Sequence, residues 1–398
     1  MRHYNLVILA GVMVALVLAG CVSAPDRELS LKPASYAGLP NGHDPLNPDQ
    51  ISPLYDQSTV TALKDGFTRF LERKHGRALN QLSLSGGGQN GAFGAGFLIG
   101  WRESGRRPQF DEVGGVSTGA LLATHAFLGT PADDAVLEEM YTTVTKDDIY
   151  KSYGILDVVL GNAHSLKDTA PLRVLIAKYI TEETLKRVAA AYAENRFIWV
   201  AATNIDYDQT WIWDMGLIAK DGRLELYRDV VLASASFPIV FPPVEIDGHL
   251  FVDGAARSNL IVAGTSGAER PKPPLYGPGN FYVIDNGRLE NPPEALRKAL
   301  GDIAATTITV MMNNSMQAAL ARTYFGARVH GYSFNFVSIP NDVTIGRDPL
   351  AFDPNQMRAA FVAGRTLANQ PDPWSHAPPK IVDLADWAFE VLEEFGER

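Results

Sequence analysis

Residues 85–91 read Ser-Gly-Gly-Gly-Gln-Asn-Gly, and residues 115–119 read Gly-Val-Ser-Thr-Gly. Each stretch follows an apolar run and precedes a helix-like segment. The second has the pattern of a nucleophile elbow, a sharp strand-to-helix turn that exposes a serine, here Ser117. The first would place backbone N–H groups at the start of a helix, where negative charge is stabilised. Together the two stretches predict a serine nucleophile that faces a backbone oxyanion hole.

The residues around Ser117 fit this interpretation. Residues 110–113 can end a short strand, and the apolar residues 118–128 predict a buried helix. Gly115 and Gly119 let the backbone turn sharply without Cβ clashes. The alternative is a glycine-rich strand-to-helix turn in which the serine is merely small, because a chain with 35 glycines can contain this pentapeptide by chance.

The glycine loop also has an alternative interpretation. Gly86, Gly88 and Gly91 follow the strand-like residues 79–84, as the glycines of a dinucleotide-binding fingerprint do. That fingerprint requires an acidic residue about 20 residues on, at the end of a second strand. The acidic pair at residues 111–112 lies near that distance, but it leads directly into the serine turn. The sequence therefore favours an oxyanion loop over a dinucleotide site.

A third segment supplies a carboxylate. Residues 233–243 read Ala-Ser-Ala-Ser-Phe-Pro-Ile-Val-Phe-Pro-Pro, and residues 248–255 read Gly-His-Leu-Phe-Val-Asp-Gly-Ala. The apolar run before Asp253 predicts a strand that ends at the carboxylate, with Gly254 opening a turn. Taken alone, Asp253 could equally be an ordinary turn-capping aspartate. Together with the glycine loop and the elbow, however, these segments give four motifs in an order that resembles the patatin-like phospholipase family, spanning residues 79–259.

This resemblance implies a fold, a site and an activity. The fold would be an α/β fold of three layers, α/β/α, with a central, mostly parallel sheet. Ser117 would be the nucleophile, and Asp253 would take its proton directly, without a histidine between them. Gly86, Gly87 and Gly88 would line the oxyanion hole, helped by the elbow. The expected reaction is hydrolysis of acyl esters of phospholipids or lysophospholipids, without a cofactor.

Two further classes of function stay open at this point. The same machinery could serve a carboxylesterase, thioesterase or acyltransferase that acts on substrates other than lipids. The chain could also be a catalytically silent envelope lipoprotein.

Four further glycines complete the motifs, namely Gly91, Gly115, Gly119 and Gly254. One position departs from the family pattern, because Asn90 stands where the family usually has Arg or Lys before the last loop glycine. Asparagine can donate hydrogen bonds but carries no charge. The departure leaves the preference for charged substrates open.

A Ser–acid–His triad is the competing arrangement, because His330 and His376 follow Asp253 in the chain order of ordinary α/β-hydrolases. His376 lies in a proline-broken segment, and His330 precedes a strand-like run. His125 falls on the predicted elbow helix, where we expect a satisfied polar group rather than a base. No pair of histidines has the spacing of a metal site, so we expect no metal ligands. The sequence therefore favours a dyad.

The N-terminus predicts a lipoprotein. A short basic start precedes an apolar stretch over residues 6–19, which is too short for a typical spanning helix. Residues 18–21 read Leu-Ala-Gly-Cys, which resembles the lipobox of bacterial lipoproteins, and Cys21 is the only cysteine in the chain. This resemblance implies cleavage before Cys21 and attachment of acyl chains to it, and two or more chains would hold the protein on a membrane. The alternatives are an uncleaved anchor and a secretory signal with an incidental cysteine.

Val22 follows the cysteine, as in lipoproteins that are sorted to the outer membrane. The expected location is therefore the bacterial cell envelope, with a lipid anchor.

Composition agrees with one catalytic domain behind this tether, because 46% hydrophobic and 20% charged residues are ordinary for a globular chain. We expect a signal peptide over residues 1–20, a lipidated spacer and lead-in over 21–75, and a hydrolase domain over 76–398, whose core motifs lie within 79–260. The net charge of −10 argues against nucleic acid and against electrostatic attraction to anionic lipid. The sequence does not indicate the oligomeric state.

Periodicity and composition also predict individual elements. Helices are expected over residues 134–144, 182–194, 293–300 and 383–395, and strands over 197–203 and 281–284. Two aromatic-containing segments, residues 211–213 and 140–141, could line an acyl groove or belong to the core, and the core is favoured.

Overall fold

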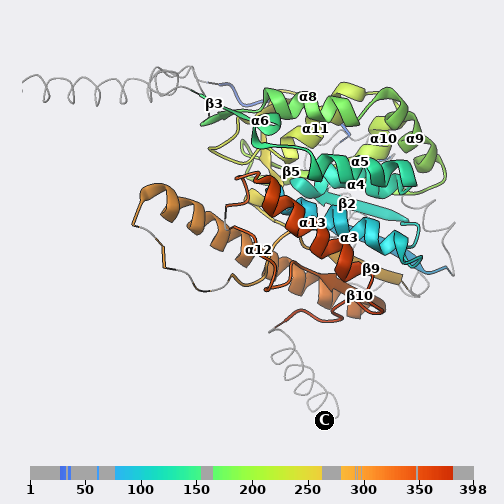
Figure 1. The fold of residues 1–398 in the computed structure, drawn as a ribbon. Helices are drawn as coiled ribbons and strands as arrows, with labels where there is room; N and C mark the ends of the chain where they lie inside the picture. The colour runs from blue at the N-terminus through green and yellow to red at the C-terminus, as the bar shows by residue number, and fades with distance from the viewer. Residues whose placement is uncertain are drawn as a thin grey trace, which may run out of the picture.

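The structure is a computed structural model, shown in Figure 1. It describes residues 27–32, 35–36, 61, 77–153, 165–261, 279–291, 293, 295–296, 298–346 and 348–379. The predicted signal peptide, Cys21, most of the predicted spacer and the helix predicted over 383–395 lie outside these residues, so the predicted domain boundaries stay predictions.

Among the described residues, eight strands form a central sheet (Figure 1). Its strands are β1 (Leu79–Leu84), β2 (Glu112–Val116), β5 (Phe197–Asn204), β6 (Gln209–Asp214), β7 (Val244–Ile246), β8 (His249–Asp253), β9 (Gly279–Ile284) and β10 (Tyr332–Val337). They are arranged in the order β10-β9-β1-β2-β5-β8-β7, and β6 also pairs with β5. The strands from β10 to β5 are parallel, whereas β6, β7 and β8 are antiparallel to their neighbours. A separate two-stranded sheet consists of β3 (Lys151–Ser152) and β4 (Lys167–Asp168).

Helices cover both faces of the sheet. They are α3 (Gly91–Glu103), α4 (Thr118–Leu128), α5 (Pro131–Thr142), α6 (Lys146–Ile149), α8 (Ala170–Tyr179), α9 (Glu182–Ala193), α10 (Met215–Lys220), α11 (Leu224–Ser234), α12 (Leu300–His330) and α13 (Pro354–Ala368). Two short 3-10 turns, η2 (Gly88–Asn90) and η3 (Gly254–Ala256), follow β1 and β8.

The apolar side chains of successive strand residues point to opposite faces, so each face has its own core. On one face, Leu82 and Val113 belong to a large cluster with residues of α3, α4, α11 and α13. On the other face, Phe281 and Phe334 pack with Met316 and neighbouring residues of α12. Figure 1 shows α3 and α13 side by side over one face, with α12 lying apart from them near β9 and β10. The predicted three-layer α/β/α fold with a mostly parallel sheet is therefore confirmed.

Most of the predicted elements are present, with shifted ends. The helix predicted over 134–144 is α5, which begins at Pro131 because Thr130 and Asp133 form a capping box there. The helix predicted over 293–300 is wrong: α12 begins at Leu300, and the residues that hold it against the sheet, such as Met316, lie further along the chain. Within the part of the chain that the structure describes, none of the helices combines the length and apolar character that a membrane crossing requires.

Candidate active site

Ser117 occupies a strained turn between β2 and α4. Its backbone has φ 57° and ψ −124°, a left-handed conformation that residues with a side chain rarely adopt. The turn is tight because the residues before and after Ser117 are in contact. A Cβ on Gly115 would lie 2.3 Å from the Gly119 carbonyl oxygen. A Cβ on Gly119 would lie 2.2 Å from the carbonyl oxygen of Leu84, at the end of β1. The predicted elbow is therefore present, and its two glycines are required by close backbone contacts.

The register of the sheet brings Ser117 and Asp253 together. Val116, the last residue of β2, pairs with Ala201 of β5, and the next residue of β5, Ala202, pairs with Asp253, the last residue of β8. Because β6 pairs with β5 on the other side, the ends of β2 and β8 meet on one side of β5. The Ser117 Oγ donates a hydrogen bond of 2.5 Å to the Asp253 Oδ2. Asp253 does end a strand, as predicted, but the strand is antiparallel, so the pairing with Ala202, and not a shared carboxyl edge, places the carboxylate.

The Asp253 carboxyl group is buried and also accepts a hydrogen bond from a backbone N–H group. Its Oδ1 accepts a hydrogen bond of 2.8 Å from the Ala255 N–H in the turn that Gly254 opens. Burial raises the pKa of Asp253 to about 7, although the hydrogen bonds from Ser117 and Ala255 act in the opposite direction. A carboxylate with such a pKa is a much better proton acceptor near neutral pH than an exposed aspartate.

A second serine fixes the elbow. The Ser117 N–H donates to the Ser234 Oγ at 2.9 Å, and the Ser234 hydroxyl donates to the Ala201 carbonyl at 2.6 Å. Ser234 lies at the end of α11, in the Ala-Ser-Ala-Ser segment that the family resemblance marks. No role for this serine could be predicted from the sequence, because its partner lies more than one hundred residues earlier in the chain.

The glycine loop lies beside the elbow, with one difference from the predicted set of donors. The Gly86 N–H donates to the Asn259 carbonyl at 3.1 Å, so it is not free to bind an oxyanion. Gly86 instead permits close packing, since a Cβ there would lie 2.4 Å from the Asn259 Oδ1 and 3.1 Å from the Ser117 Cβ. The N–H groups of Gly87, Gly88 and Thr118 donate to no other described residue. The oxyanion hole stays a prediction, with Gly87, Gly88 and the elbow as the available donors.

The last loop glycine joins the loop to the elbow. A Cβ on Gly91 would lie 2.2 Å from the Thr118 Oγ1 and 2.7 Å from the Tyr141 ring. The Thr118 and Tyr141 hydroxyls are themselves 2.5 Å apart and buried. The starts of α3 and α4 are therefore locked against each other.

The nucleophile opens into an apolar pocket of about 780 Å³. Gly88, Ser117 and Asp253 are among the residues that line it, and most of the other lining residues are apolar, including Leu121, Met140, Leu172, Ile176, Phe241 and Phe352. Of the two segments weighed above, 140–141 lines this pocket, whereas Trp211 and Trp213 are buried in the core beside Phe251.

The described histidine side chains contact neither Ser117 nor Asp253. His376 is exposed and lies 3.3 Å from the Asp372 Oδ2, and His249 contacts the Lys32 carbonyl at 3.0 Å. The side chain of His330 lies outside the described residues. Among the residues that are described, there is also no group of three or more His, Cys, Asp or Glu that could hold a metal ion.

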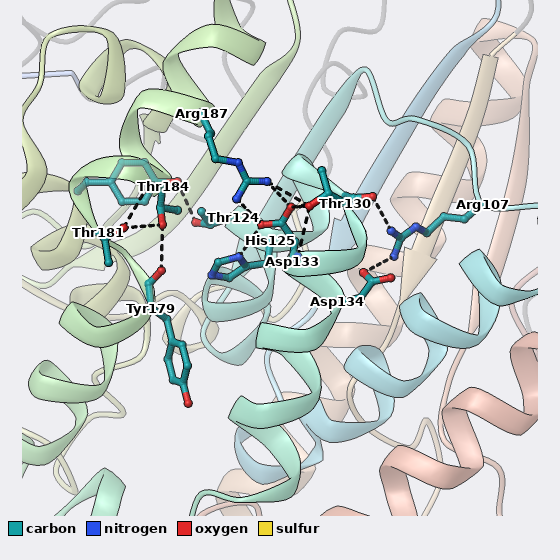
Figure 2. A network of polar contacts seen from close by, with 12 residues as sticks. Arg107, Thr124, His125, Thr130, Asp133, Asp134, Tyr179, Thr181, Thr184 and Arg187 are labelled. Carbon is teal, nitrogen blue, oxygen red and sulfur yellow. Dashed lines mark hydrogen bonds and ion pairs between the residues drawn. The ribbon is translucent and has the colours of Figure 1, made fainter.

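His125 belongs to a network at the far end of the elbow helix, shown in Figure 2. Its Nδ1 lies 3.0 Å from the Asp133 Oδ1, and Arg187 of α9 donates to both oxygens of that carboxylate. Burial alone would raise the pKa of Asp133, but hydrogen bonds from His125, Arg187 and Thr130 hold it below the usual range. His125 is thus a buried polar group rather than a base, paired through its Nδ1, whereas its Nε2 has no hydrogen-bond partner among the described residues. The network ties α4, α5 and α9 together.

A second buried aspartate, which was not among the residues predicted from the sequence, lies behind the glycine loop. Asp285 follows β9, and its Oδ1 is 2.9 Å from the Ser85 Oγ. Burial raises the pKa of Asp285 to about 7. An Asp-Asn-Gly sequence directly after a buried strand was a signal that could have identified it, by the same reasoning that identified Asp253.

Comparison with known proteins agrees with the motifs. Residues 82–265 match the sequence model of the family described as patatin-like phospholipase. No curated protein matches the chain. Among solved structures, the chain is similar to the crystal structure of VipD from Legionella pneumophila, with a TM-score of 0.35 and 12% identity, covering 73% of this chain and 66% of that one. The chain thus spans just under two thirds of the VipD chain, and the assignment rests on the sequence match.

The matched segment contains the glycine loop, the strained serine turn and the aspartate to which that serine donates its hydrogen bond. Residues 82–265 of the chain therefore match a patatin-like phospholipase domain.

Proposed function

We propose that this protein is a serine acyl hydrolase that cleaves ester bonds of phospholipids or lysophospholipids. The observation that carries the proposal is the hydrogen bond of 2.5 Å from the Ser117 hydroxyl to the buried Asp253 carboxylate, at the wall of an apolar pocket. This is a nucleophile in contact with its base, with no histidine between them.

The reaction has two halves. The Ser117 Oγ attacks the acyl carbonyl carbon while its proton passes to the Asp253 Oδ2, and free N–H groups of Gly87, Gly88 and Thr118 stabilise the oxyanion. Collapse of the tetrahedral intermediate expels the alcohol, which takes the proton from Asp253. Water then attacks the acyl carbon while Asp253 accepts its proton. Collapse of the second tetrahedral intermediate breaks the bond between the acyl carbon and the Ser117 Oγ, which takes the proton back from Asp253 as the fatty acid leaves.

The pocket favours an acyl chain as the group that enters. Its wall is largely apolar, so a charged group would be desolvated there without a partner. An alkyl chain instead gains about 0.8 kcal/mol for each methylene that is buried. These properties support a lipid over a small polar ester.

Exposed apolar residues adjoin the residues that line the pocket. Val174 is 70% exposed beside the lining residue Leu175, and Met311 is 66% exposed beside Met312. Ile239 is 73% exposed in the segment that carries two lining phenylalanines. Exposed apolar side chains on the segments that line the pocket favour contact with a lipid surface, and this supports a substrate taken from a membrane.

The tether is the second part of the proposal. Cys21 and its lipobox-like sequence would attach the domain to the bacterial envelope, with a preference for the outer membrane. A Cys21→Ser variant is then expected in the soluble fraction, and the native sequence in the membrane fraction. Equal partition of the two forms would contradict lipid attachment.

Substrate class is tested with purified protein. Fatty acid release is measured from phospholipid, lysophospholipid and triglyceride dispersions and from short p-nitrophenyl esters. Ser117→Ala serves as the inactive form, and Ser333→Ala on the edge strand β10 is the matched control. The proposal expects release from phospholipid or lysophospholipid that Ser117→Ala abolishes and Ser333→Ala retains. Cleavage of the short esters alone would indicate a non-lipid esterase, and no cleavage by folded protein would indicate a silent lipoprotein.

A further inference from the structure

Three buried polar residues support the glycine loop from behind and have no part in the reaction described above. Ser85 follows β1, and Asp285 and Asn286 follow β9. These strands are parallel neighbours with Leu84 paired to Ile284, so the three residues leave the sheet side by side. All three are at most 1% exposed.

Their hydrogen bonds hold the loop at several points. The Asn286 side chain donates to the Ser85 carbonyl at 2.8 Å and accepts from the Gly94 N–H at 3.1 Å. The Ser85 hydroxyl lies 2.8 Å from the Gly86 carbonyl. Gly87 packs directly on this cluster, because a Cβ there would lie 1.9 Å from the Asn286 carbonyl oxygen. Movement in the cluster would therefore displace the loop.

The count of protons decides the charge state of the cluster. The Ser85 Oγ accepts from the Asn286 N–H at 2.8 Å and lies close to two further oxygens, the Gly86 carbonyl at 2.8 Å and the Asp285 Oδ1 at 2.9 Å. One hydroxyl proton cannot serve both oxygens well. If Asp285 carries a proton, its O–H donates to Ser85, and the Ser85 hydroxyl donates to Gly86. Each of the three contacts of the Ser85 hydroxyl is then a hydrogen bond with its own proton.

The second carboxyl oxygen points to the same state. The Asp285 Oδ2 is buried and has no hydrogen-bond partner among the described residues. An ionised carboxylate with a bare buried oxygen is strongly disfavoured, whereas a protonated carboxyl group carries no net charge to solvate.

We infer that Asp285 is a positioning residue in the protonated form, which directs the Ser85 hydroxyl to the Gly86 carbonyl and so fixes the loop that supplies oxyanion donors. The inference rests on the proposed function, because the loop matters only if an oxyanion forms. Asp285 does not touch the reacting atoms in this account. It acts through Ser85.

The charged groups around Asp285 do not offset its burial. Arg288, three residues on, donates its guanidinium to the carbonyls of Val343 and Pro340, and the charge that acts on it is that of Asp342. β1 carries no ionisable residue, and the only ionisable residue of β10 is Tyr332. The charged residues of α3, Arg102 and Glu103, lie in its last turn, at the opposite end from the glycine loop. Hydrogen bonds from Ser85 and the Gly287 backbone lower the pKa of Asp285, but burial outweighs them.

The consequence is a pH dependence with two limbs. Asp253 must be ionised to accept the Ser117 proton, so activity rises as the pH increases through its pKa. Asp285 must keep its proton, so activity falls as the pH increases through the pKa of Asp285. Both pKa values are about 7, so the two limbs meet near neutral pH. Once ionised, the Asp285 Oδ1 attracts the Ser85 proton away from Gly86, and the loop loses a hydrogen bond. The profile of kcat/KM against pH is therefore bell-shaped.

Asp285→Asn separates this role from a merely structural one. The amide has the size of the acid, donates an N–H in place of the O–H, and does not ionise. We expect this variant to keep kcat/KM within about threefold of the native value at the optimum and to lose the alkaline limb. The matched control is Asp214→Asn, a buried aspartate that caps α10 and should leave both limbs unchanged. An unchanged alkaline limb in Asp285→Asn, or a loss of more than about tenfold at the optimum, would overturn the inference.

An infrared spectrum keeps the test independent of catalysis. At mildly acidic pH Asp253 is protonated as well, so spectra of native protein and variants are subtracted from each other. The difference spectrum should show a protonated-carboxyl band that is lost in Asp285→Asn and shifted in Ser85→Ala, which removes the hydrogen-bond partner. If neither variant changes the band, the inference fails even if the enzyme is active. If the band behaves as expected but no ester is cleaved, the proposed function fails and the protonated state of Asp285 stands.

Discussion

The burial that makes Asp253 a base should also destabilise the folded protein at neutral pH. The pKa of Asp253 is raised from 3.8 to about 7, chiefly because the group is buried. The unfolded chain therefore releases this proton at a lower pH than the folded protein does. Between these two pKa values the stability of the folded state falls as the pH rises, and below both values the group has no effect.

The size of the effect follows from the shift. A shift of about three pKa units corresponds to about 4 kcal/mol, because one unit is about 1.4 kcal/mol. Asp253→Asn removes the ionisable group, so this variant should gain about 4 kcal/mol relative to the native protein on going from about pH 4 to about pH 8. The other buried acids are common to both proteins, so their contributions cancel in the comparison.

The assay is urea unfolding of the native protein and Asp253→Asn at several pH values. Asp372→Asn is the control, because Asp372 is exposed and a hydrogen bond with His376 lowers its pKa, which gives the opposite sign. A difference between native and Asp253→Asn stability that does not change with pH would refute the reasoning. It would mean that Asp253 ionises as an exposed aspartate does and is a poor base near neutrality.

Three other substitutions test separate parts of the site. Ser117→Gly should be more stable than Ser117→Ala by on the order of 1 kcal/mol in urea unfolding, because glycine adopts a positive φ without strain; equal stabilities would argue against a strained elbow. Gly88→Ala should lower kcat/KM by about a hundredfold or more while the circular dichroism spectrum stays native. The reason is that its Cβ would lie 2.2 Å from the Pro349 carbonyl oxygen, at a residue with φ of 56°. Native activity would exclude this part of the loop from the oxyanion hole. His376→Ala should keep kcat/KM within about twofold, since this side chain is exposed and contacts Asp372 and the Phe334 carbonyl; a large loss would restore the histidine triad.

The sequence could predict those parts of the site that depend on local patterns. The glycines around Ser117 identify the elbow because only a few residues set that turn. The strand before Asp253 was visible in an apolar run that ends at an Asp-Gly turn. The three-layer fold followed from a family resemblance that those motifs carried together.

The remaining features depend on contacts between distant segments. The Ser234 hydroxyl accepts from the Ser117 N–H, and the Asn259 carbonyl accepts from the Gly86 N–H. Both hydrogen bonds form only after β2, β5 and the segment after β8 have assembled. The pairing of β1 with β9 likewise brings Asp285 to Ser85 across about half the chain. No spacing in the sequence encodes these pairings, because sheet register is set by packing of the whole core.

The central claim is that Ser117 attacks while Asp253 takes its proton. A fluorophosphonate tests it directly, because it reacts with an activated serine whatever the natural substrate is. Mass spectrometry of the labelled native protein should place the phosphonyl group on Ser117, and Asp253→Asn should react at least about a hundredfold more slowly while remaining folded. Labelling at another residue, or labelling of Asp253→Asn at the native rate, would contradict the account.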